Sequence, residues 1–577
     1  MRNGGVRMLL TKWGEALDRE RPLPEYPRPQ LRRESFLNLN GVWDCAFTRE
    51  NAEPYEYDGE IVVPFAPESA LSGVGRALMP GEYLWYRRCF ELPEGFNAGR
   101  VLLHFGAVDQ CARVWLNGQD VCVHEGGFLP FSADITELLC EGENVLVVRV
   151  TDDTDRSFRT RGKQKLKPGG IWYGPVSGIW QTVWCESVPE NHISSLFIRP
   201  ELESGSVEIT CGGEGTVRAV IDGGAAFEFA AGEGALLKLE DVRPWTPETP
   251  NLYKLELTLG EDRVESYFAL RSVGIGEDRR GVKRLTLNGK PYFMNGLLDQ
   301  GWWPDGLYTA PSDEALAFDI AAAKAMGFNT LRKHVKVEPA RWYYHCDRLG
   351  MLVWQDMPNG GGSYSAVTVS APLLTGAHSR DSKYGKFARR DKRGRAEFRE
   401  ELLDMVSHLY NSPSIVMWVL FNEGWGQFDS DALAAAVAEI DPTRLIDRAS
   451  GWHDQGTGEL RSIHLYFDDY KYKPDKAGRC VILSEFGGYS LPVPGHAVTD
   501  KPFGYKKFRE PDKYRRALTL LYDGQIRPAC MQGLAAAVYT QLTDVETELN
   551  GLISYDRRVI KLAPEDIKRI IAMPGVI

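Results

Sequence analysis

The 577-residue sequence predicts a multidomain protein: an N-terminal β jelly-roll, an immunoglobulin-like β-sandwich and a C-terminal (β/α)8 TIM barrel. Length is the first observation, because a chain of this size suggests about three or four domains. The second is a first half filled with short strand-like runs, and the third is a second half in which strands alternate with helices. We place the domains at residues 1–187, 188–276 and 277–577.

The first segment is all-β from about residue 35 onward. Short runs such as RVLLHFG, ARVWLNG, DVCVHEG and NVLVVRV alternate apolar and polar residues and are separated by turn signals, which is typical of a jelly-roll. Asn117-Gly118 lies between two of these runs and predicts a tight hairpin, because both positions of a type I′ turn need a positive φ.

The second segment contains fewer strands in a shorter stretch of chain. SVEITCG, TVRAVID, LYKLELTLG and ESYFALRSVGI have the length and number that suit a small immunoglobulin-like sandwich. The Cys…Trp…Cys signature of such domains is missing, so the strands indicate the architecture alone.

The third segment alternates strands with amphipathic helices. Ser312 precedes a helix, Gly327 follows it, and Pro339 and Gly350 bracket the next helix. Eight candidate strands in about 300 residues favour a barrel over a doubly wound open sheet, since no GxGxxG or Walker-type loop follows any strand. The strand candidates are FMNGLLD, FNTLRKH, MLVWQDMP, SIVMWVLF, TRLIDRAS, SIHLYFD, CVILSEF and LAAAVYTQL.

Composition excludes several function classes. A net charge of −11 and a pI near 5.6 argue against a nucleic-acid partner. The one basic run, residues 386–395, is predicted to be a solvated loop. The ten cysteines are scattered without metal-ligand spacing, and no export signal or membrane-spanning run is visible. We therefore expect a cytoplasmic enzyme without membrane association, metal or cofactor, and its oligomeric state stays open.

Two of the apolar strands end on a carboxylate. Asn422-Glu423 follows SIVMWVLF, and Glu485 lies in VILSEFGG. Buried strands of this kind belong to parallel sheets, and the C-terminal rim of a barrel is where the chemistry takes place. Two carboxylates, one neutral and one ionised, are the groups that cleave a glycosidic bond, and Asn422 could bind a sugar hydroxyl beside that bond. The alternative is that each Glu only caps its strand.

Longer motifs make a resemblance specific. LNGVWDCAF, ARVWLNG, SGIWQTVW, FNTLRKH, SIVMWVLFNEGW, SEFGG and YTQLTDVETELNGLISYDR together resemble glycoside hydrolase family 2, over nearly the whole chain. The resemblance implies that Glu423 is the general acid/base and Glu485 the nucleophile of a retaining reaction, with the carboxyl groups ~5–5.5 Å apart. It also implies that Tyr466 hydrogen-bonds the nucleophile and that Arg332 supports its charge.

Other residues at the strand ends are weaker candidates for contact with the sugar. They are His334, His464, Asp299, Asp356 and Trp452. Each histidine could equally be a structural residue, and Trp452 could either stack on a sugar or pack under the rim.

The sugar is not determined by these motifs. The glucuronidases of the family carry Asn-x-Lys where this chain has Glu548-Leu549-Asn550-Gly551, so glucuronide hydrolysis is not expected. Gln541 stands where many β-galactosidases of the family have a large aromatic residue. The expected partner is thus an oligosaccharide or glycoside, β-galactoside by family default. β-Mannosidase or α-L-arabinosidase activity, or a non-catalytic carbohydrate-binding protein, remain as alternatives.

Overall fold

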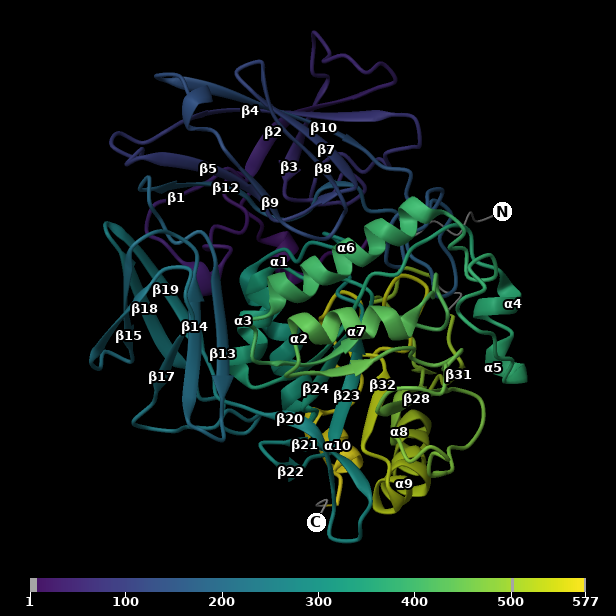
Figure 1. Cartoon of the computed structure of the whole chain (residues 1–577). Coiled ribbons are helices and arrows are strands. Elements are labelled where there is room, and N and C mark those ends of the chain that lie inside the picture. The colour runs from purple at the N-terminus through teal and green to yellow at the C-terminus, as the bar shows by residue number, and fades with distance from the viewer. Residues whose placement is uncertain (1–7, 500–502, 575–577) are drawn as a thin grey trace, which may run out of the picture.

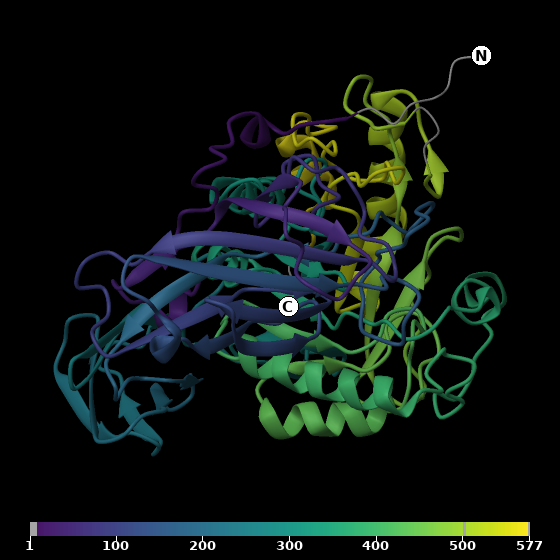
Figure 2. The same cartoon turned by 90° about the horizontal axis from the view of Figure 1, so that it is seen from above.

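The computed structural model describes residues 8–499 and 503–574, which form two β-sandwiches and one barrel. In Figure 1 the N-terminal sheets lie at the top, the second set of strands at the left, and the barrel below and to the right. Seen from above, the N-terminal strands lie over the barrel (Figure 2). Residues 1–7, part of the segment judged to lack an export signal, lie outside the described residues.

Two antiparallel sheets form the N-terminal sandwich. Their inner faces enclose one apolar core that includes Trp43, Tyr86 and Val148. The predicted hairpin is confirmed at Asn117 and Gly118, whose φ values are +51° and +76°. The strands are β1 (Phe36–Asn38), β12 (Val183–Val188), β5 (Arg100–Phe105) and β9 (Phe131–Asp134) in one sheet, and β3 (Gly59–Val63), β2 (Gly41–Thr48), β4 (Tyr83–Glu91), β10 (Glu143–Thr151), β7 (Cys111–Leu116) and β8 (Gln119–Glu125) in the other.

A second pair of antiparallel sheets encloses a core of its own, which includes Ile209, Leu255 and Phe268. Alternating buried and exposed residues along each strand direct one face of each sheet inward. The strands are β13 (Leu196–Glu201), β14 (Ser206–Cys211) and β17 (Ala235–Lys238) in one sheet, and β16 (Ala226–Ala230), β15 (Thr216–Ile221), β18 (Tyr253–Leu259) and β19 (Asp262–Phe268) in the other.

The C-terminal half contains the predicted eight parallel strands, in sequential order around a nearly closed barrel. The sheet ends at β27 and β28, which lie against each other without forming a ladder. Residues of β25 and β26 are buried on both faces of the sheet, which is why these strands read as largely continuous apolar runs. The strands are β23 (Met294–Asp299), β24 (Thr330–Lys333), β25 (Leu352–Asp356), β26 (Ile415–Val419), β27 (Leu445–Asp447), β28 (Leu460–Leu465), β29 (Cys480–Gly487) and β32 (Ala536–Thr540).

Helices connect most of these strands, and the predicted boundaries hold. Ser312 caps the first, because its hydroxyl accepts a hydrogen bond from the Ala315 amide at 3.1 Å. Gly350 ends the second in the left-handed conformation, with φ of +75°. The helices of this half are α2 (Asp313–Ala325), α3 (Ala340–Leu349), the short α4 (Ala366–Val369) and α5 (Pro372–Thr375), α6 (Lys392–Leu409), α7 (Ser430–Ile440), α8 (Pro511–Leu521), α9 (Arg527–Gln532) and α10 (Pro564–Ile571).

The barrel departs from full (β/α)8 regularity at two connections. Residues 448–459 and 466–479, both described throughout, contain no helix.

The prediction that the basic run at residues 386–395 is a solvated loop is wrong in part. α6 begins inside it at Lys392, and Arg389 is buried, with its guanidinium donating to the carbonyl oxygens of Gly426 at 2.9 Å and Phe158 at 3.3 Å. Arg389 thereby joins the N-terminal part of the chain to the barrel.

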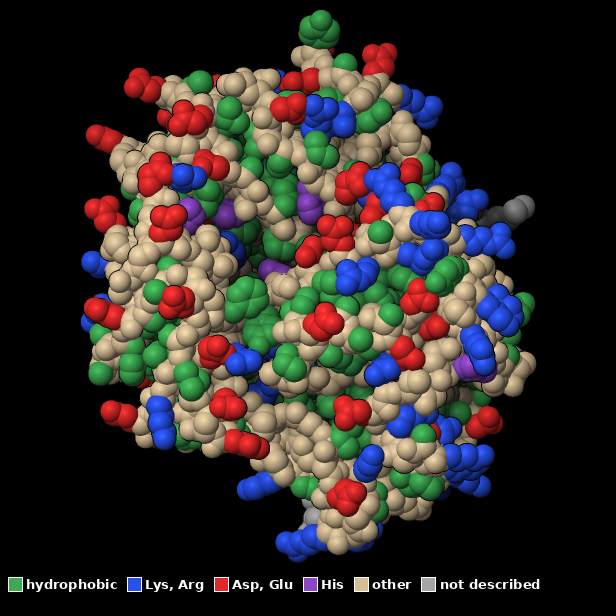
Figure 3. Space-filling view, in the orientation of Figure 1, with side chains coloured by type: hydrophobic (Ala, Val, Ile, Leu, Met, Phe, Trp, Pro, Cys, Tyr) green, Lys and Arg blue, Asp and Glu red, His purple; other side chains and the backbone are tan. Residues whose placement is uncertain are grey.

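The surface carries both signs of charge. On the face in Figure 3, acidic and basic side chains are interspersed, and neither sign covers a broad area. Within residues 8–499 and 503–574, no helix has the length and hydropathy needed to cross a membrane.

Candidate active site

Glu423 and Glu485 meet at the C-terminal rim of the barrel, as their positions in the sequence predicted. Glu485 lies near the end of β29, and Glu423 follows β26 by four residues. Both are buried, and one oxygen of each lies within 4.8 Å of the other and of a ring nitrogen of His464. Glu423 has a φ of +48°, an uncommon value for a residue with a side chain, so the turn after β26 holds its carboxyl in a defined direction.

Arg332, on β24, donates hydrogen bonds to three other residues of the site, Glu485, Asn422 and Asp356. Its guanidinium is completely buried and donates to Glu485 Oε1 at 3.1 Å and to Asn422 Oδ1 at 2.8 Å. Asp356, on β25, accepts two further bonds at 2.9 Å, which fixes the guanidinium plane. Burial disfavours the charge on Arg332, but Asp356 and Glu485 more than compensate, and its pKa is raised.

Tyr466 contacts Glu485 as the resemblance implied, and Asn422 lies beside Arg332. The Tyr466 hydroxyl donates to Glu485 Oε2, and burial beside that carboxylate raises the pKa of Tyr466 well above its ordinary value. Because Arg332 can only donate, it holds the Asn422 carbonyl oxygen toward itself and turns Nδ2 the other way. Asn422 Nδ2 is buried and has no hydrogen-bond partner among the described residues.

The two histidines lie beside the carboxylates. His464 Nδ1 is 3.0 Å from Glu423 Oε1 and 3.6 Å from Glu485 Oε2. Burial lowers the pKa of His464 to about 3, so the ring is neutral near pH 7. His334 Nε2 lies 3.7 Å from Glu485 Oε1, and it too is buried without a hydrogen-bond partner among the described residues.

Asp299 and Trp452 do not contact the two carboxylates. Lys333 donates to Asp299 Oδ2 at 2.6 Å and the Gly301 amide to Oδ1 at 2.9 Å, so both oxygens are engaged inside the barrel wall. Trp452 packs edge-on against His464 with 5.5 Å between ring centroids, and its indole N–H donates to the Val369 carbonyl. Trp452 therefore packs against the His464 ring.

The two carboxyl groups have different surroundings. Burial raises the pKa of Glu423 to about 7, against the opposing charges of Lys163 and Arg332. Glu485 instead receives hydrogen bonds from the Arg332 guanidinium and the Tyr466 hydroxyl, which stabilise its ionised form. Glu423 is thus suited to carry a proton near neutral pH, whereas two hydrogen-bond donors are directed at Glu485.

The side chains of Glu423, His464 and Glu485 carry oxygen and nitrogen atoms that lie close enough together to be considered as ligands of a metal ion. Glu423, His464 and Glu485 form the one such cluster found among the described residues. The cationic Arg332 contacts Glu485 directly, and a second cation at this position would be repelled by it.

The sequence patterns did not identify several residues of the site, because these residues lie on loops. Lys163 and Tyr173 come from the N-terminal part of the chain, between β10 and β11 (Gly178–Ile179), and reach Glu548 beyond β32. Tyr505 stacks on Tyr466 with 3.9 Å between ring centroids. The Gly- and Trp-rich stretch around Tyr173 was a visible signal in the sequence, whereas Tyr505 had none.

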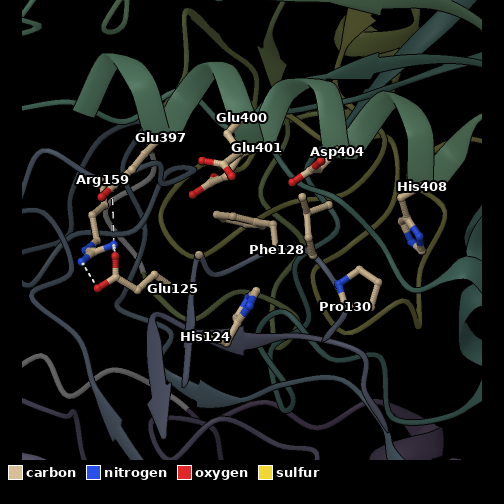
Figure 4. A pocket seen from close by; sticks show the side chains of 12 residues that line it. His124, Glu125, Phe128, Pro130, Arg159, Glu397, Glu400, Glu401, Asp404 and His408 are labelled. Atoms are coloured by element: carbon tan, nitrogen blue, oxygen red, sulfur yellow. Dashed lines mark hydrogen bonds and ion pairs between the residues drawn. The ribbon is translucent and has the colours of Figure 1, made fainter. Parts of the chain in front are cut away.

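The cavity in Figure 4 lies away from this rim. It measures about 410 Å³ and separates β8 and the following turn from α6. Carboxylates from α6 face His124 and Phe128 across it, and Arg159 bridges its edge through an ion pair with Glu125 at 3.1 Å. None of the residues predicted to act on substrate lines this cavity.

Three family models match the chain in succession and together cover well over half of it. They are "Glycosyl hydrolases family 2, sugar binding domain" at residues 77–186, "Glycosyl hydrolases family 2" at 191–271 and "Glycosyl hydrolases family 2, TIM barrel domain" at 280–481. The last match includes Arg332, Asn422 and Glu423 and ends just before Glu485.

Curated relatives include a beta-galactosidase of Vibrio vulnificus, 26% identical over 69% of this chain and 37% of the relative. The large subunit of a beta-galactosidase of Leuconostoc lactis is 26% identical over 76% of this chain and 70% of the relative. The chain thus spans less than half the length of several curated relatives that it matches.

Solved structures share the fold along nearly the whole chain. A beta-D-glucuronidase of Dictyoglomus thermophilum superposes with a TM-score of 0.73 at 19% identity, covering 95% of this chain and 99% of its own. A beta-galacturonidase of Eisenbergiella tayi gives 0.69 at 19% identity, with 95% and 97% covered. Matched in sequence by three successive models, and built as a sandwich followed by a barrel, the chain belongs to glycosyl hydrolases family 2.

Proposed function

We propose that the protein is a retaining exo-glycosidase that hydrolyses terminal β-linked glycosides, with β-galactosides as the first substrates to test. The observation that carries the proposal is the pair Glu423 and Glu485, two buried carboxyl groups with oxygens within 4.8 Å and contrasting surroundings. Retaining glycosidases separate these groups by about 5–5.5 Å, whereas inverting enzymes need about 6.5–9.5 Å to admit a water. The names of the curated relatives support the substrate class.

In the first step Glu485 attacks the anomeric carbon while Glu423 donates its proton to the departing oxygen. Arg332 and Tyr466 donate hydrogen bonds to Glu485 and orient it, and the raised pKa of Glu423, about 7, leaves about half of this residue protonated at pH 7. In the second step Glu423, now ionised, removes a proton from water, and that water releases the sugar from Glu485 with net retention.

Asn422 supplies transition-state binding in this scheme. Its unpaired Nδ2 is oriented by Arg332 and lies next to the acid/base residue, where it can donate to the hydroxyl adjacent to the anomeric carbon. That hydrogen bond strengthens as the sugar becomes oxocarbenium-like. A buried donor without a partner costs free energy, and the substrate relieves the cost.

The test is covalent trapping of the intermediate. A 2-deoxy-2-fluoro glycoside with a good leaving group is expected to inactivate the enzyme and to add its mass to the peptide that contains Glu485. Glu485→Gln should escape labelling and lose hydrolysis by a factor of ~10⁴ or more. A p-nitrophenyl glycoside panel with that variant as blank identifies the sugar. Near-wild-type rates for Glu485→Gln, or a label on another residue, would contradict the assignment.

A further inference from the structure

A lysine from the N-terminal sandwich is buried at the barrel rim with few partners of its own. Lys163 is 4% exposed, and its ammonium lies 3.4 Å from the Tyr173 hydroxyl, 3.9 Å from Glu548 Oε2 and 4.9 Å from the centroid of the Tyr173 ring. An ammonium group has three hydrogens to donate, and a buried one normally finds an acceptor for each. The contacts made within the chain leave donor capacity unused.

Glu548 is the partner of opposite charge, and it is held firmly. The Tyr173 hydroxyl donates to its Oε2 at 2.6 Å and Asn550 Nδ2 to its Oε1 at 3.0 Å, and the side chain is 2% exposed. A carboxylate oxygen accepts more than one hydrogen bond, so each oxygen can still accept another. Lys163 and Glu548 thus place a donor and an acceptor side by side.

This pair faces the catalytic carboxyl groups. A chain of hydrogen bonds runs from Asn550 through Gln541 and Gln300 to His334, with lengths of 2.7, 2.8 and 3.0 Å, and His334 reaches Glu485. The charges of Lys163 and Glu548 also act in opposite directions on the pKa of Glu423. The pair is therefore connected to the catalytic carboxyl groups through hydrogen bonds and lies close enough to Glu423 to influence its pKa.

The chemistry of the pair selects one kind of sugar substituent. A hydroxyl both donates and accepts, so neighbouring hydroxyls can receive a hydrogen bond from Lys163 and give one to Glu548. A carboxylate only accepts, and the anionic Glu548 would repel it.

We propose that Lys163 and Glu548 jointly bind neighbouring hydroxyl groups of a neutral glycosyl residue and that the pair excludes uronic acid glycosides. This inference rests on the proposed glycosidase function and assigns its substrate class. It also makes the N-terminal sandwich part of the substrate site, because Lys163 and Tyr173 reach it across the domain boundary.

The experiment compares kcat/KM for a p-nitrophenyl glycoside and for the uronide of the same stereochemistry. Wild type is expected to prefer the neutral sugar. Glu548→Gln removes the repulsion and leaves Lys163 free, so the uronide-to-neutral ratio should rise about 10-fold or more. Because the ratio is taken within one preparation, a fraction of misfolded protein does not affect it. A wild-type preference for the uronide, or an unchanged ratio in Glu548→Gln, would overturn the proposal.

Lys163→Met tests the donor half of the pair. It should lower kcat/KM for the neutral glycoside about 10-fold or more, and the loss in the double variant with Glu548→Gln should be smaller than the product of the two single losses. Lys167→Met is the matched control, since Lys167 is an exposed lysine of the same loop and should leave kcat/KM unchanged. Multiplicative losses would show that the residues act separately and would contradict the pair.

Fluorosugar labelling separates this inference from the proposed function. If Glu485 is labelled in every variant while the uronide-to-neutral ratio stays constant, the function stands and the assigned substrate class fails. If Glu485 is labelled in none of them, wild type included, the proposed function itself fails.

Discussion

Glu423 is buried beside charges of both signs, and these set the pH range in which it acts as an acid. Its pKa is raised to about 7, mainly by burial, while Lys163 and Arg332 oppose the rise and Glu548 adds to it. A general acid must be protonated to act, so kcat/KM is expected to fall as pH increases through about 7. Lys163→Met removes an opposing charge and should move this limb to higher pH. The pH dependence of kcat/KM in wild type and in Lys163→Met measures the shift. If the falling limb of the variant stays in place or moves to lower pH, the effect assigned to Lys163 is contradicted.

Removing the acid should affect substrates according to their leaving groups. Glu423→Ala is expected to slow glycosides with poor leaving groups by about 10²–10⁴-fold, because their oxygen must be protonated as it departs. Activated aryl glycosides leave as stabilised anions, so their first step should be slowed far less. Rates for a series of leaving groups provide the measurement. Equal losses across the series would assign Glu423 a different role.

Residues at strand ends could be predicted from the sequence, and residues on loops could not. Arg332 and Glu485 lie on barrel strands and Tyr466 directly follows β28, and the barrel geometry brings the ends of its strands to one rim. Lys163 and Tyr505 reach the site from long connections, and their positions depend on how separate parts of the chain pack together. No local pattern in the sequence contains that information.

Several barrel strands, such as β25 and β29, were predictable as elements because they are largely apolar runs buried on both faces. The basic run at 386–395 was misjudged because its composition indicates solvent. Asp391 caps α6 inside the run, with its carboxylate accepting from the Gly394 amide at 3.1 Å, and backbone carbonyls satisfy the buried Arg389. Charge predicts exposure only where no buried acceptors are available.

α3 is fixed to its surroundings by one buried carboxylate. Asp347 accepts from the Tyr267 hydroxyl of β19 at 2.7 Å and from the Ser414 amide, just before β26, at 2.9 Å. Asp347→Ala leaves both donors buried without an acceptor and should lower the free energy of unfolding by about 2–4 kcal/mol, measured by urea titration. Asp347→Asn keeps an oxygen for Ser414 and is the matched control, which should lose less. An alanine variant as stable as wild type would exclude this role.

On the scale of the whole molecule, buried ion pairs join the two sandwiches. Arg33 donates to Asp262 at 2.9 Å and to Glu186 Oε2 at 3.2 Å, and so joins β12 of the first sandwich to the second. Burial alone would raise the pKa of Glu186, but the positive charges of Arg28 and Arg33 and the hydrogen bond from Tyr26 bring it down to about 2. The ion pairs of Glu186 therefore stabilise the folded state at neutral pH and are lost when acid protonates this carboxylate.

The sign of that pH dependence follows from the lowered pKa of Glu186. The folded state holds Glu186 ionised down to about pH 2, whereas an unfolded chain protonates it near pH 4.3. Its stabilisation is therefore complete above about pH 4.5 and is lost as pH falls toward 2. Arg33→Met leaves Glu186 and Asp262 buried without this cation. It should cost about 3–5 kcal/mol at pH 7 and move acid unfolding to higher pH.

Urea unfolding followed by circular dichroism between pH 2 and pH 8 tests this expectation. The control is Arg32→Met, because the neighbouring Arg32 pairs with Glu265 at the surface, where both side chains are about half exposed. Exposed pairs of this kind contribute little, so the control should unfold like wild type at every pH. If Arg33→Met and Arg32→Met behave alike, the contact between the two sandwiches is maintained by apolar packing and backbone pairing, and the buried ion pairs only orient it.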